Sequence, residues 1–336
     1  MATIKQIAEE CGVSMTTVSR VLNGKNKEVW SSTANRSKEI RRVAEKLQFR
    51  PNGLARAMRR GSFHSVTMIE PTGQWRSTRF TELFDGLQDR LAAADFHLVL
   101  ERLPDTKLIN EGFLPRILRE SSSDGLLVNY DSKFPPEILT LIRKYRIPFV
   151  WINAKIDADC VYPDDFQSSY LATRRLLELG HRKIAYLNQM SLHYSRTDRR
   201  GGYVRAMAEA GLADRVVEVS VGEEDNRLAL TKGLLTGEDR PTALVAYESY
   251  TITPALVAAA TLGLRVPEDL SLVTFSTAPA WTAGVPITTC IVPFYEVGQA
   301  AADMLLAKIE QPEVTFPPKA IASTVTKGST CVAPQP

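Results

Sequence analysis

The sequence predicts an α/β protein that combines a small three-helix head at the N-terminus with a larger, two-lobed core of doubly wound parallel sheets. Two patterns support this fold class. The first fifty residues place apolar side chains at helical spacing, whereas from His64 onward short runs rich in Val, Ile and Leu alternate with amphipathic stretches. The length of 336 residues exceeds that of one small domain and suits such a combination.

Residues 4–23, IKQIAEECGVSMTTVSRVLN, have the pattern of a helix-turn-helix. Gly12 ends the first helix because glycine readily adopts the left-handed conformation of a tight turn. Ser14 can cap the second helix, in which Val18 and Val21 point inward. A helix placed in this way presents its first residues to base edges in the major groove. We therefore expect DNA contacts from its exposed face and its ends, at Met15, Thr16, Thr17, Ser19, Arg20 and Asn23.

A third helix and a short basic segment follow. Thr33 can cap this helix, in which Ile40 and Val43 keep the helical spacing. Pro51 ends it, because the residue before a proline is pushed out of helical geometry. Residues 51–62 form a basic segment that could be helical but is too short to hold a helix alone.

The segments VSMTTVSRVLN and FRPNGLARAM closely resemble the lactose and purine repressor (LacI/GalR) family. In that family the second segment is a hinge helix that folds on the operator and inserts a leucine pair into the central minor-groove step. The resemblance implies DNA contacts for Asn52, Ala55 and Met58, and Met58 stands where leucine is usual. Methionine is apolar and flexible enough to act as such a wedge. The family implies a repressor that binds a near-palindromic operator as a homodimer, controlled by a small-molecule effector such as a sugar.

Charge is distributed unevenly along the chain. Residues 1–62 hold thirteen Lys and Arg against five Glu, a formal charge of +8, while the remainder carries −5 and the whole chain +3. A compact basic head attracts phosphates and contributes a salt-dependent share of affinity for double-stranded DNA. The acidic remainder is not expected to wrap DNA.

The region after His64 alternates expected strands with expected helices. The strands are predicted at residues 65–69, 97–100, 125–129, 148–152, 183–187, 216–219, 243–246 and 270–275. The helices are predicted at residues 80–94, 136–145, 168–179, 202–210, 253–262 and 295–310. Such an order implies parallel sheets covered by helices on both faces.

Three further segments, LLELGHRKIA, GLRVPEDLSLV and PITT, resemble the effector-binding core of the same family, which has the periplasmic-binding-protein type I fold. The resemblance implies a helix-turn-helix head at residues 1–50, a hinge helix at 51–62 and a core at 63–330. Within the core it implies one lobe of residues 64–162 and 291–318 and another of residues 163–290 and 319–330. The family's tetramers use a leucine heptad tail, which residues 326–336 lack, so we expect a dimer.

A cleft between two such lobes lies at the carboxyl ends of parallel strands, the usual ligand site of open α/β sheets. Asn129 and Asn153 each end a predicted strand and carry amides suited to sugar hydroxyls. The resemblance implies that Arg199, which precedes a Gly-aromatic pair, contacts the effector. With the aromatic and cleft positions of the family pattern, the expected effector site comprises Phe80, Asn129, Asn153, Ser195, Arg199, Tyr247, Ser276 and Phe294.

Two positions of this expected site depart from the family pattern. Tyr247-Glu248 stands where Asn-Asp is usual, and Ser276 stands where Asp is usual. The usual acidic and amide groups hold pyranose hydroxyls, which tyrosine and serine cannot clamp as a carboxylate does. The loop of residues 71–80 also adds Trp75, Arg76 and Arg79. A neutral sugar, an acidic or otherwise unusual ligand, and no ligand at all therefore remain alternatives.

Other classes of function find little support in the sequence. It contains no phosphate loop, no G-x-S-x-G elbow and no H-E-x-x-H, so we expect neither a catalytic site nor a cofactor. The four cysteines lack metal-ligand spacing, which predicts reduced thiols and no metal site. A transport receptor would share the core fold, but the basic head and the absence of a signal-peptide pattern argue against it. We expect a cytoplasmic protein without membrane association.

Overall fold

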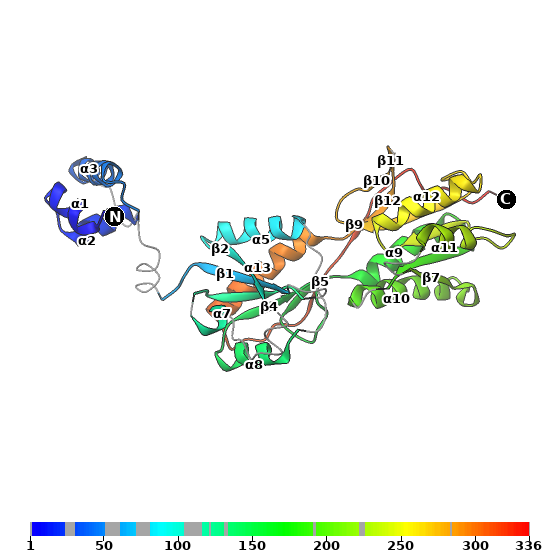
Figure 1. The fold of residues 1–336 in the computed structure, drawn as a ribbon, viewed down its shortest axis with the longest axis horizontal. Helices are drawn as coiled ribbons and strands as arrows, with labels where there is room; N and C mark the ends of the chain where they lie inside the picture. The colour runs from blue at the N-terminus through cyan, green and yellow to red at the C-terminus, as the bar shows by residue number, and fades with distance from the viewer. Residues whose placement is uncertain are drawn as a thin grey trace. The chain divides into compact units, whose positions relative to one another are not determined.

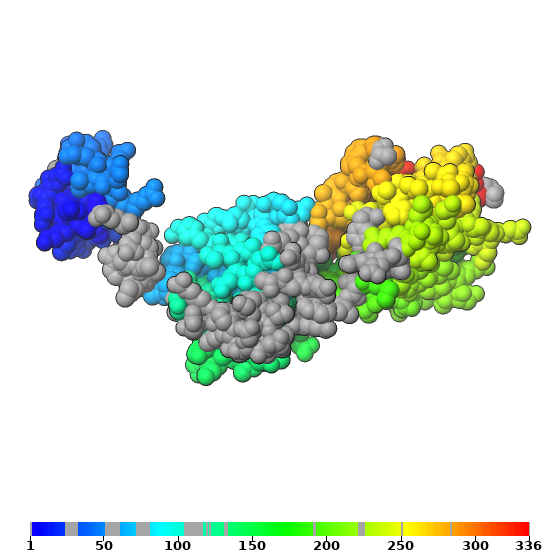
Figure 2. Space-filling model, viewed as in Figure 1, coloured from blue at the N-terminus to red at the C-terminus, as the bar shows by residue number. Residues whose placement is uncertain are grey.

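The computed structural model describes residues 2–23, 31–50, 61–71, 81–103, 116–120, 122–130, 134–190, 193–221, 226–282 and 284–335. The chain forms two compact units, Met1–Phe63 and His64–Pro336, which we call the head and the core (Figures 1 and 2). The expected hinge at 51–62 lies outside the described residues except for Gly61 and Ser62. Among the described residues, no helix combines the length and apolarity that crossing a bilayer requires.

The head consists of α1 (Ile4–Cys11), α2 (Met15–Leu22) and α3 (Ser31–Lys46). The turn between the first two helices is made by Gly12 at φ 63°, as its sequence position predicts. Ile7, Val18 and Ile40, one from each helix, are fully buried against one another and form the centre of the head. The prediction that Thr33 caps the third helix is wrong, because α3 already begins at Ser31. Thr33 lies within its first turn.

The first sheet of the core has the strand order β13-β5-β4-β3-β1-β2, and all of its pairings are parallel. Its strands are β1 (Ser65–Pro71), β2 (His97–Leu103), β3 (Gly125–Val128), β4 (Phe149–Ile152), β5 (Cys160–Pro163) and β13 (Lys319–Ile321). One face packs against α5 (Thr81–Ala93) and α13 (Phe294–Glu310). The other packs against α7 (Arg116–Arg119) and α8 (Pro136–Lys144) (Figure 1).

The second sheet has the order β14-β12-β9-β8-β6-β7, parallel except for β14, which runs antiparallel to β12. Its strands are β6 (Ile184–Gln189), β7 (Val217–Val221), β8 (Ala243–Ala246), β9 (Ser271–Ser276), β12 (Thr288–Ile291) and β14 (Thr324–Val325). One face packs against α9 (Asp165–Glu178) and α10 (Tyr194–Glu209), the other against α11 (Arg227–Leu234) and α12 (Ile252–Thr261). A hairpin of β10 (Trp281–Thr282) and β11 (Val285–Pro286) lies outside the sheet.

The two sheets and their helices are the two lobes that the alternating pattern predicts. Each of the eight predicted strands is present within a few residues of its expected position. Helix α10 begins at Tyr194, whereas the sequence pattern predicted a start near residue 202. The prediction missed the first two turns, YSRTDRR, because they are polar and show no apolar stripe. The first sheet reaches Ile321, beyond the expected lobe boundary at residue 318, because β13 pairs with β5.

Candidate DNA interface and ligand site

The second helix of the head is fixed at its start by a side-chain cap. The Thr17 amide donates a hydrogen bond of 3.1 Å to Ser14 Oγ, and the hydroxyls of these two residues lie 2.9 Å apart. The cap satisfies a backbone N–H that the helix itself leaves without a partner. Thr17, which we expected at the DNA, therefore already has an internal partner for its hydroxyl.

The other expected contact residues of α2 fall into two groups. Met15 is 56 % exposed, and Thr16 and Arg20 are also exposed, with no side-chain hydrogen bond to any described residue. At the end of the helix, the Asn23 amide donates to the Ser19 carbonyl at 2.6 Å and to Ser19 Oγ at 3.2 Å. The side chains of Met15, Thr16 and Arg20 are therefore available for contacts with base edges. Ser19 and Asn23 are hydrogen-bonded to each other.

Some of the head's positive charge is neutralised internally. Lys46 Nζ lies 2.6 Å from Glu10 Oε1, and Arg42 donates to both carboxylate oxygens of Glu39. The hydrogen bonds from Arg42 lower the pKa of Glu39, so that this carboxylate stays charged and keeps its partner. The basic field of the head therefore comes from its other cations, among them Arg20.

A chain of hydrogen bonds crosses the core between the two lobes. His193 Nε2 lies 2.9 Å from the carbonyl oxygen of Asn153, and its Nδ1 lies 2.7 Å from Ser195 Oγ. Ser195 Oγ is in turn 2.6 Å from the Tyr247 hydroxyl. A carbonyl only accepts, so Nε2 carries the proton and Nδ1 accepts from Ser195, whose oxygen then accepts from Tyr247. This network joins three of the expected site residues, Asn153, Ser195 and Tyr247, through His193.

Arg199 is a buried cation that is fixed by an ion pair and by a hydrogen bond to a backbone carbonyl. Its Nε donates to Asp165 Oδ1 at 2.7 Å, and one terminal nitrogen donates to the Tyr247 carbonyl at 2.6 Å. The guanidinium also lies 4.7 Å from the ring centre of Tyr247 and 4.5 Å from that of Phe275. Burial opposes its charge, but Asp165 and the Tyr247 phenol outweigh that effect and raise the pKa of Arg199. Two of its five N–H donors are thus used inside its own lobe.

A cavity of about 180 Å³ opens beside this arginine. Arg199, Ser276 and Phe294 line it, so the fold brings together three expected site residues from distant parts of the chain. Glu248 and Thr277 line it too, and burial raises the pKa of Glu248 against the opposing influence of Arg199. The cavity offers aromatic side chains, one paired cation and one partly buried acid.

Two amide oxygens near the ends of first-sheet strands have no partner among the described residues. Oδ1 of Asn129 and Oδ1 of Asn153 are both buried and accept no hydrogen bond. The Asn129 amide nitrogen donates to Glu70 Oε1 at 3.1 Å, which fixes the direction of its oxygen. Buried acceptors without partners are costly, and a ligand that donates hydrogen bonds would remove that cost.

One ion pair and one further hydrogen bond also join the two lobes. Lys155, after β4, lies 2.6 Å from Asp198 of α10, and this carboxylate raises the pKa of Lys155 against the effect of burial. Thr277 donates to Glu82 of α5 at 2.7 Å. Each of these contacts joins a residue of the first lobe to a residue of the second.

The structure leaves some expected site residues aside and adds others. Asn52, Ala55, Met58 and Phe80 lie outside the described residues. Asp165 and the linking role of His193 could not be predicted from the sequence, because their partners are 34 and 40 residues away along the chain. Asp165 is the first residue of α9, after a strand (β5) that the sequence pattern did not predict. Among the described residues, no group of His, Cys, Asp and Glu is arranged to hold a metal ion.

Comparisons with known proteins agree with this architecture. Residues 3–52 match the model of bacterial regulatory proteins of the lacI family, and residues 173–331 match a periplasmic binding protein-like domain. The HTH-type transcriptional repressor PurR of Pectobacterium carotovorum subsp. carotovorum (strain PC1) is 30% identical over 317 residues, which cover 92% of this chain and 91% of the repressor.

Two solved structures share the fold. The lac repressor dimer bound to operator and the anti-inducer ONPF aligns over 99% of both chains, with a TM-score of 0.77 and 19% identity. The transcriptional regulator CelR in complex with cellobiose aligns over 98% of this chain and 100% of its own, with a TM-score of 0.67 and 21% identity. With its matching head, its matching core and a relative of such identity along nearly its whole length, the chain belongs to the lacI family of bacterial regulatory proteins.

Proposed function

We propose that this regulator is a transcriptional repressor that binds a near-palindromic operator as a homodimer and is controlled by a small-molecule effector in the interlobe cleft. The observation that carries the proposal is the exposed face of α2. Met15, Thr16 and Arg20 stand free on a helix that Val18 and Val21 anchor in the head. This is the arrangement in which a recognition helix enters the major groove.

Each free residue of α2 suits a particular kind of base contact. The guanidinium of Arg20 can bind guanine O6 and N7 together, and the Thr16 hydroxyl can donate or accept. Met15 offers an apolar surface to a thymine methyl group. The internally bonded pair Ser19 and Asn23 shapes the end of the helix. Arg20 is therefore the residue that we expect to contribute most to sequence discrimination.

The homodimer follows from the symmetry of the proposed operator. One head carries a single recognition helix, and two half-sites about one helical turn apart require two heads. The related lac repressor was solved as a dimer on its operator, which supports the same arrangement here. Action on chromosomal DNA would place this protein in the cytoplasm.

The effector proposal rests on the unpartnered acceptors that follow β3 and β4. Asn129 Oδ1 and Asn153 Oδ1 need donors, and hydroxyl groups of a carbohydrate-derived metabolite supply them. The related CelR structure holds cellobiose, a ligand of this chemistry. Binding would regulate the protein if the ligand prefers one arrangement of the lobes, because allosteric coupling requires different affinities for two states. The Lys155–Asp198 and Thr277–Glu82 contacts are the ones such a ligand would change.

We do not propose an enzymatic function. Among the described residues, Ser195 beside His193 resembles a nucleophile with its base, but Ser195 is only 4 % exposed. Its oxygen is also bonded to the Tyr247 hydroxyl, so no substrate carbonyl can approach it. The pair instead ties α10 to the first lobe.

A gel-shift experiment tests the proposal. A DNA ligand is first selected with the full chain from a random double-stranded library, and its binding is then compared with that of a chain lacking residues 1–61. We expect the full chain to retard the selected DNA at nanomolar concentrations and the headless core not to retard it. Equal retardation by the core would contradict the proposal. A thermal-shift screen of the full chain against a metabolite panel then tests for an effector.

A further inference from the structure

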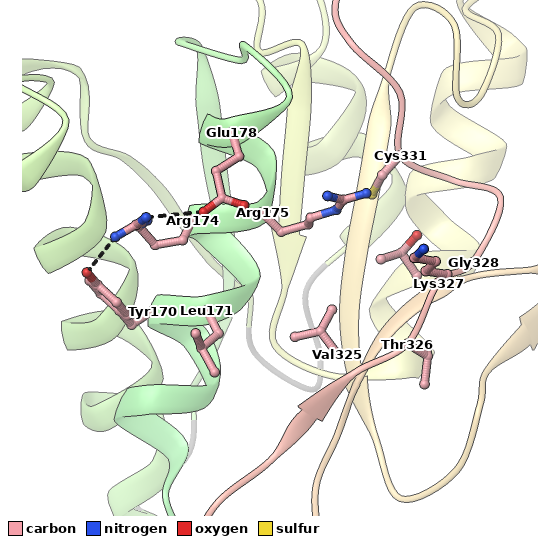
Figure 3. Close-up of a pocket in the computed structure, with 11 residues that line it drawn as sticks. Tyr170, Leu171, Arg174, Arg175, Glu178, Val325, Thr326, Lys327, Gly328 and Cys331 are labelled. Atoms are coloured by element: carbon pink, nitrogen blue, oxygen red, sulfur yellow. Dashed lines mark hydrogen bonds and ion pairs between the residues drawn. The ribbon is translucent and has the colours of Figure 1, made fainter.

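The second lobe holds a pocket of about 580 Å³ on the outer side of α9, away from the residues of the proposed effector site. Helix α9 forms one wall, and the C-terminal segment from Val325 to Cys331 forms the other (Figure 3). Its volume lies within the range of sites for small molecules. The lining residues are Tyr170, Leu171, Arg174, Arg175, Glu178, Thr288, Val325, Thr326, Lys327, Gly328 and Cys331.

The C-terminal wall is fixed in place before any ligand arrives. The Thr326 amide donates to the Thr289 carbonyl at 2.8 Å, and His181 Nε2 lies 2.9 Å from the Val332 carbonyl. Gly328 is pressed so closely on β12 that a Cβ atom there would lie 2.2 Å from the Thr288 amide nitrogen. The pocket is therefore a built feature of the fold, with walls that hold their positions.

The charges that line the pocket do not balance. Arg174 donates to Glu178 at 3.1 Å and to the Tyr170 hydroxyl at 3.2 Å, so its charge is matched by one carboxylate. Figure 3 shows these bonds directed away from the C-terminal segment, whereas Arg175 extends across the pocket toward Cys331. Arg175 and Lys327 form no ion pair with any described residue. Two cations thus remain without a counter-charge in a core whose net charge is negative.

The pocket also contains hydrogen-bonding groups without partners. The Thr288 hydroxyl is buried and has no hydrogen-bond partner among the described residues, with only the weakly bonding Cys331 thiol beside it. The backbone amides of Lys327 and Gly328 also donate to no described residue. A buried hydroxyl such as that of Thr288 usually has a partner, whereas Lys327 is exposed and Gly328 only partly buried. All three groups are able to donate to an oxygen.

We propose that this pocket binds a phosphate monoester, with the phosphate held by Arg175 and Lys327 and the organic part lying against Leu171 and Val325. Two cations and several N–H and O–H donors match the oxygens of a phosphate, and charge-assisted bonds of this type are strong. The pocket is much larger than a phosphate group alone, and its apolar side chains suit an organic substituent. This site does not depend on the proposed effector site, since the two share no residue.

Calorimetric titration of the full chain in a low-salt, phosphate-free buffer tests the proposal. Phenyl phosphate, inorganic phosphate and phenol are the three probes. We expect one phenyl phosphate per chain, competition by inorganic phosphate and no binding of phenol. Tighter binding of phenyl phosphate than of inorganic phosphate would assign the site to esters, and equal affinities would assign it to free phosphate.

Variants locate the binding. The double variant Arg175→Gln with Lys327→Gln should lower the affinity for phenyl phosphate at least about tenfold, because two charge-assisted bonds are lost. The matched pair Arg143→Gln with Lys319→Gln, at exposed cations outside the pocket, should bind within twofold of wild type. Thr288→Val should weaken binding several-fold without lowering the melting temperature, since it removes a hydroxyl that has no partner. Unchanged binding by the Arg175 and Lys327 variant, or no binding of phenyl phosphate to the wild type, would overturn the proposal.

Discussion

Arg199 Nε and Asp165 Oδ1 lie 2.7 Å apart in a pair whose side chains are 8% and 2% exposed. The pair joins α10 to the first turn of α9, so it lies between the two helices on one face of the second sheet. Replacing a buried pair with apolar side chains is often neutral, whereas removing one member leaves a charge without a partner. Arg199 is therefore a structural residue as well as a member of the proposed effector site.

Arg199→Ala should lower the free energy of unfolding of the core by about 3–5 kcal/mol, because Asp165 is left buried and unpaired. The double variant Asp165→Leu with Arg199→Met should recover most of this loss. Urea unfolding of the three proteins measures the difference. Wild-type stability in Arg199→Ala would show that the pair is not buried as described.

Arg20→Ala should weaken operator binding by about 1–3 kcal/mol and relax the preference at one base pair in each half-site. The reason is the loss of a bidentate contact from a side chain that engages nothing in the described head. Arg42→Ala is the matched control, since Arg42 is held by Glu39. Titrations on operator and random DNA check the prediction. An equal loss on both DNAs would mean that Arg20 contacts only phosphate.

Ser14→Ala should destabilise the head by about 1 kcal/mol, because the Thr17 amide loses its acceptor at the start of α2. Thermal unfolding of the head transition measures the effect. Thr16→Ala, on the exposed face of the same helix, should leave the transition nearly unchanged. A similar melting temperature for Ser14→Ala and wild type would contradict the capping role.

His181 should make the stability of the core depend on pH. Burial lowers the pKa of His181, whose ring nitrogens lie 2.8 Å from Thr242 Oγ1 and 2.9 Å from the Val332 carbonyl. Below the unfolded-state pKa of about 6.5 the unfolded chain binds a proton that the folded chain resists. Stability should therefore be complete above this pH and fall as the pH drops below it.

The variant His181→Gln isolates this contribution to the pH dependence. It has no titrating group at the position, so its unfolding free energy should fall less steeply between about pH 6.5 and pH 5 than that of the wild type. Urea unfolding at several pH values gives both slopes. Parallel slopes would assign the pH dependence to other groups, whatever the absolute stability of the variant.

The local parts of this fold could be predicted from the sequence. Val18, Val21 and Ile40 recur at helical spacing, and all three are buried in the head. The helical register also placed Met15 and Arg20 on the exposed face. Such patterns are readable because the periodicity of an element is contained in its own residues. The first turns of α10 were missed because they are polar.

Contacts between distant elements could not be predicted in this way. Arg199 was identified by resemblance, but its partner Asp165 lies on another helix, and only the packing of α9 against α10 brings the two together. The network from Asn153 through His193 to Tyr247 likewise joins three separate segments. The pocket beside Arg175 depends on the position of the C-terminal segment, and that position cannot be predicted from the periodicity of the sequence.

Hydroxyl-radical footprinting on the selected DNA tests the central claim most directly, because it shows how many heads bind and in which orientation. We predict two protected half-sites related by a twofold axis, with centres about one helical turn apart. The Arg20→Ala variant should weaken both half-sites equally. A single protected half-site, or two half-sites arranged as a direct repeat, would contradict a homodimeric repressor that reads DNA through α2.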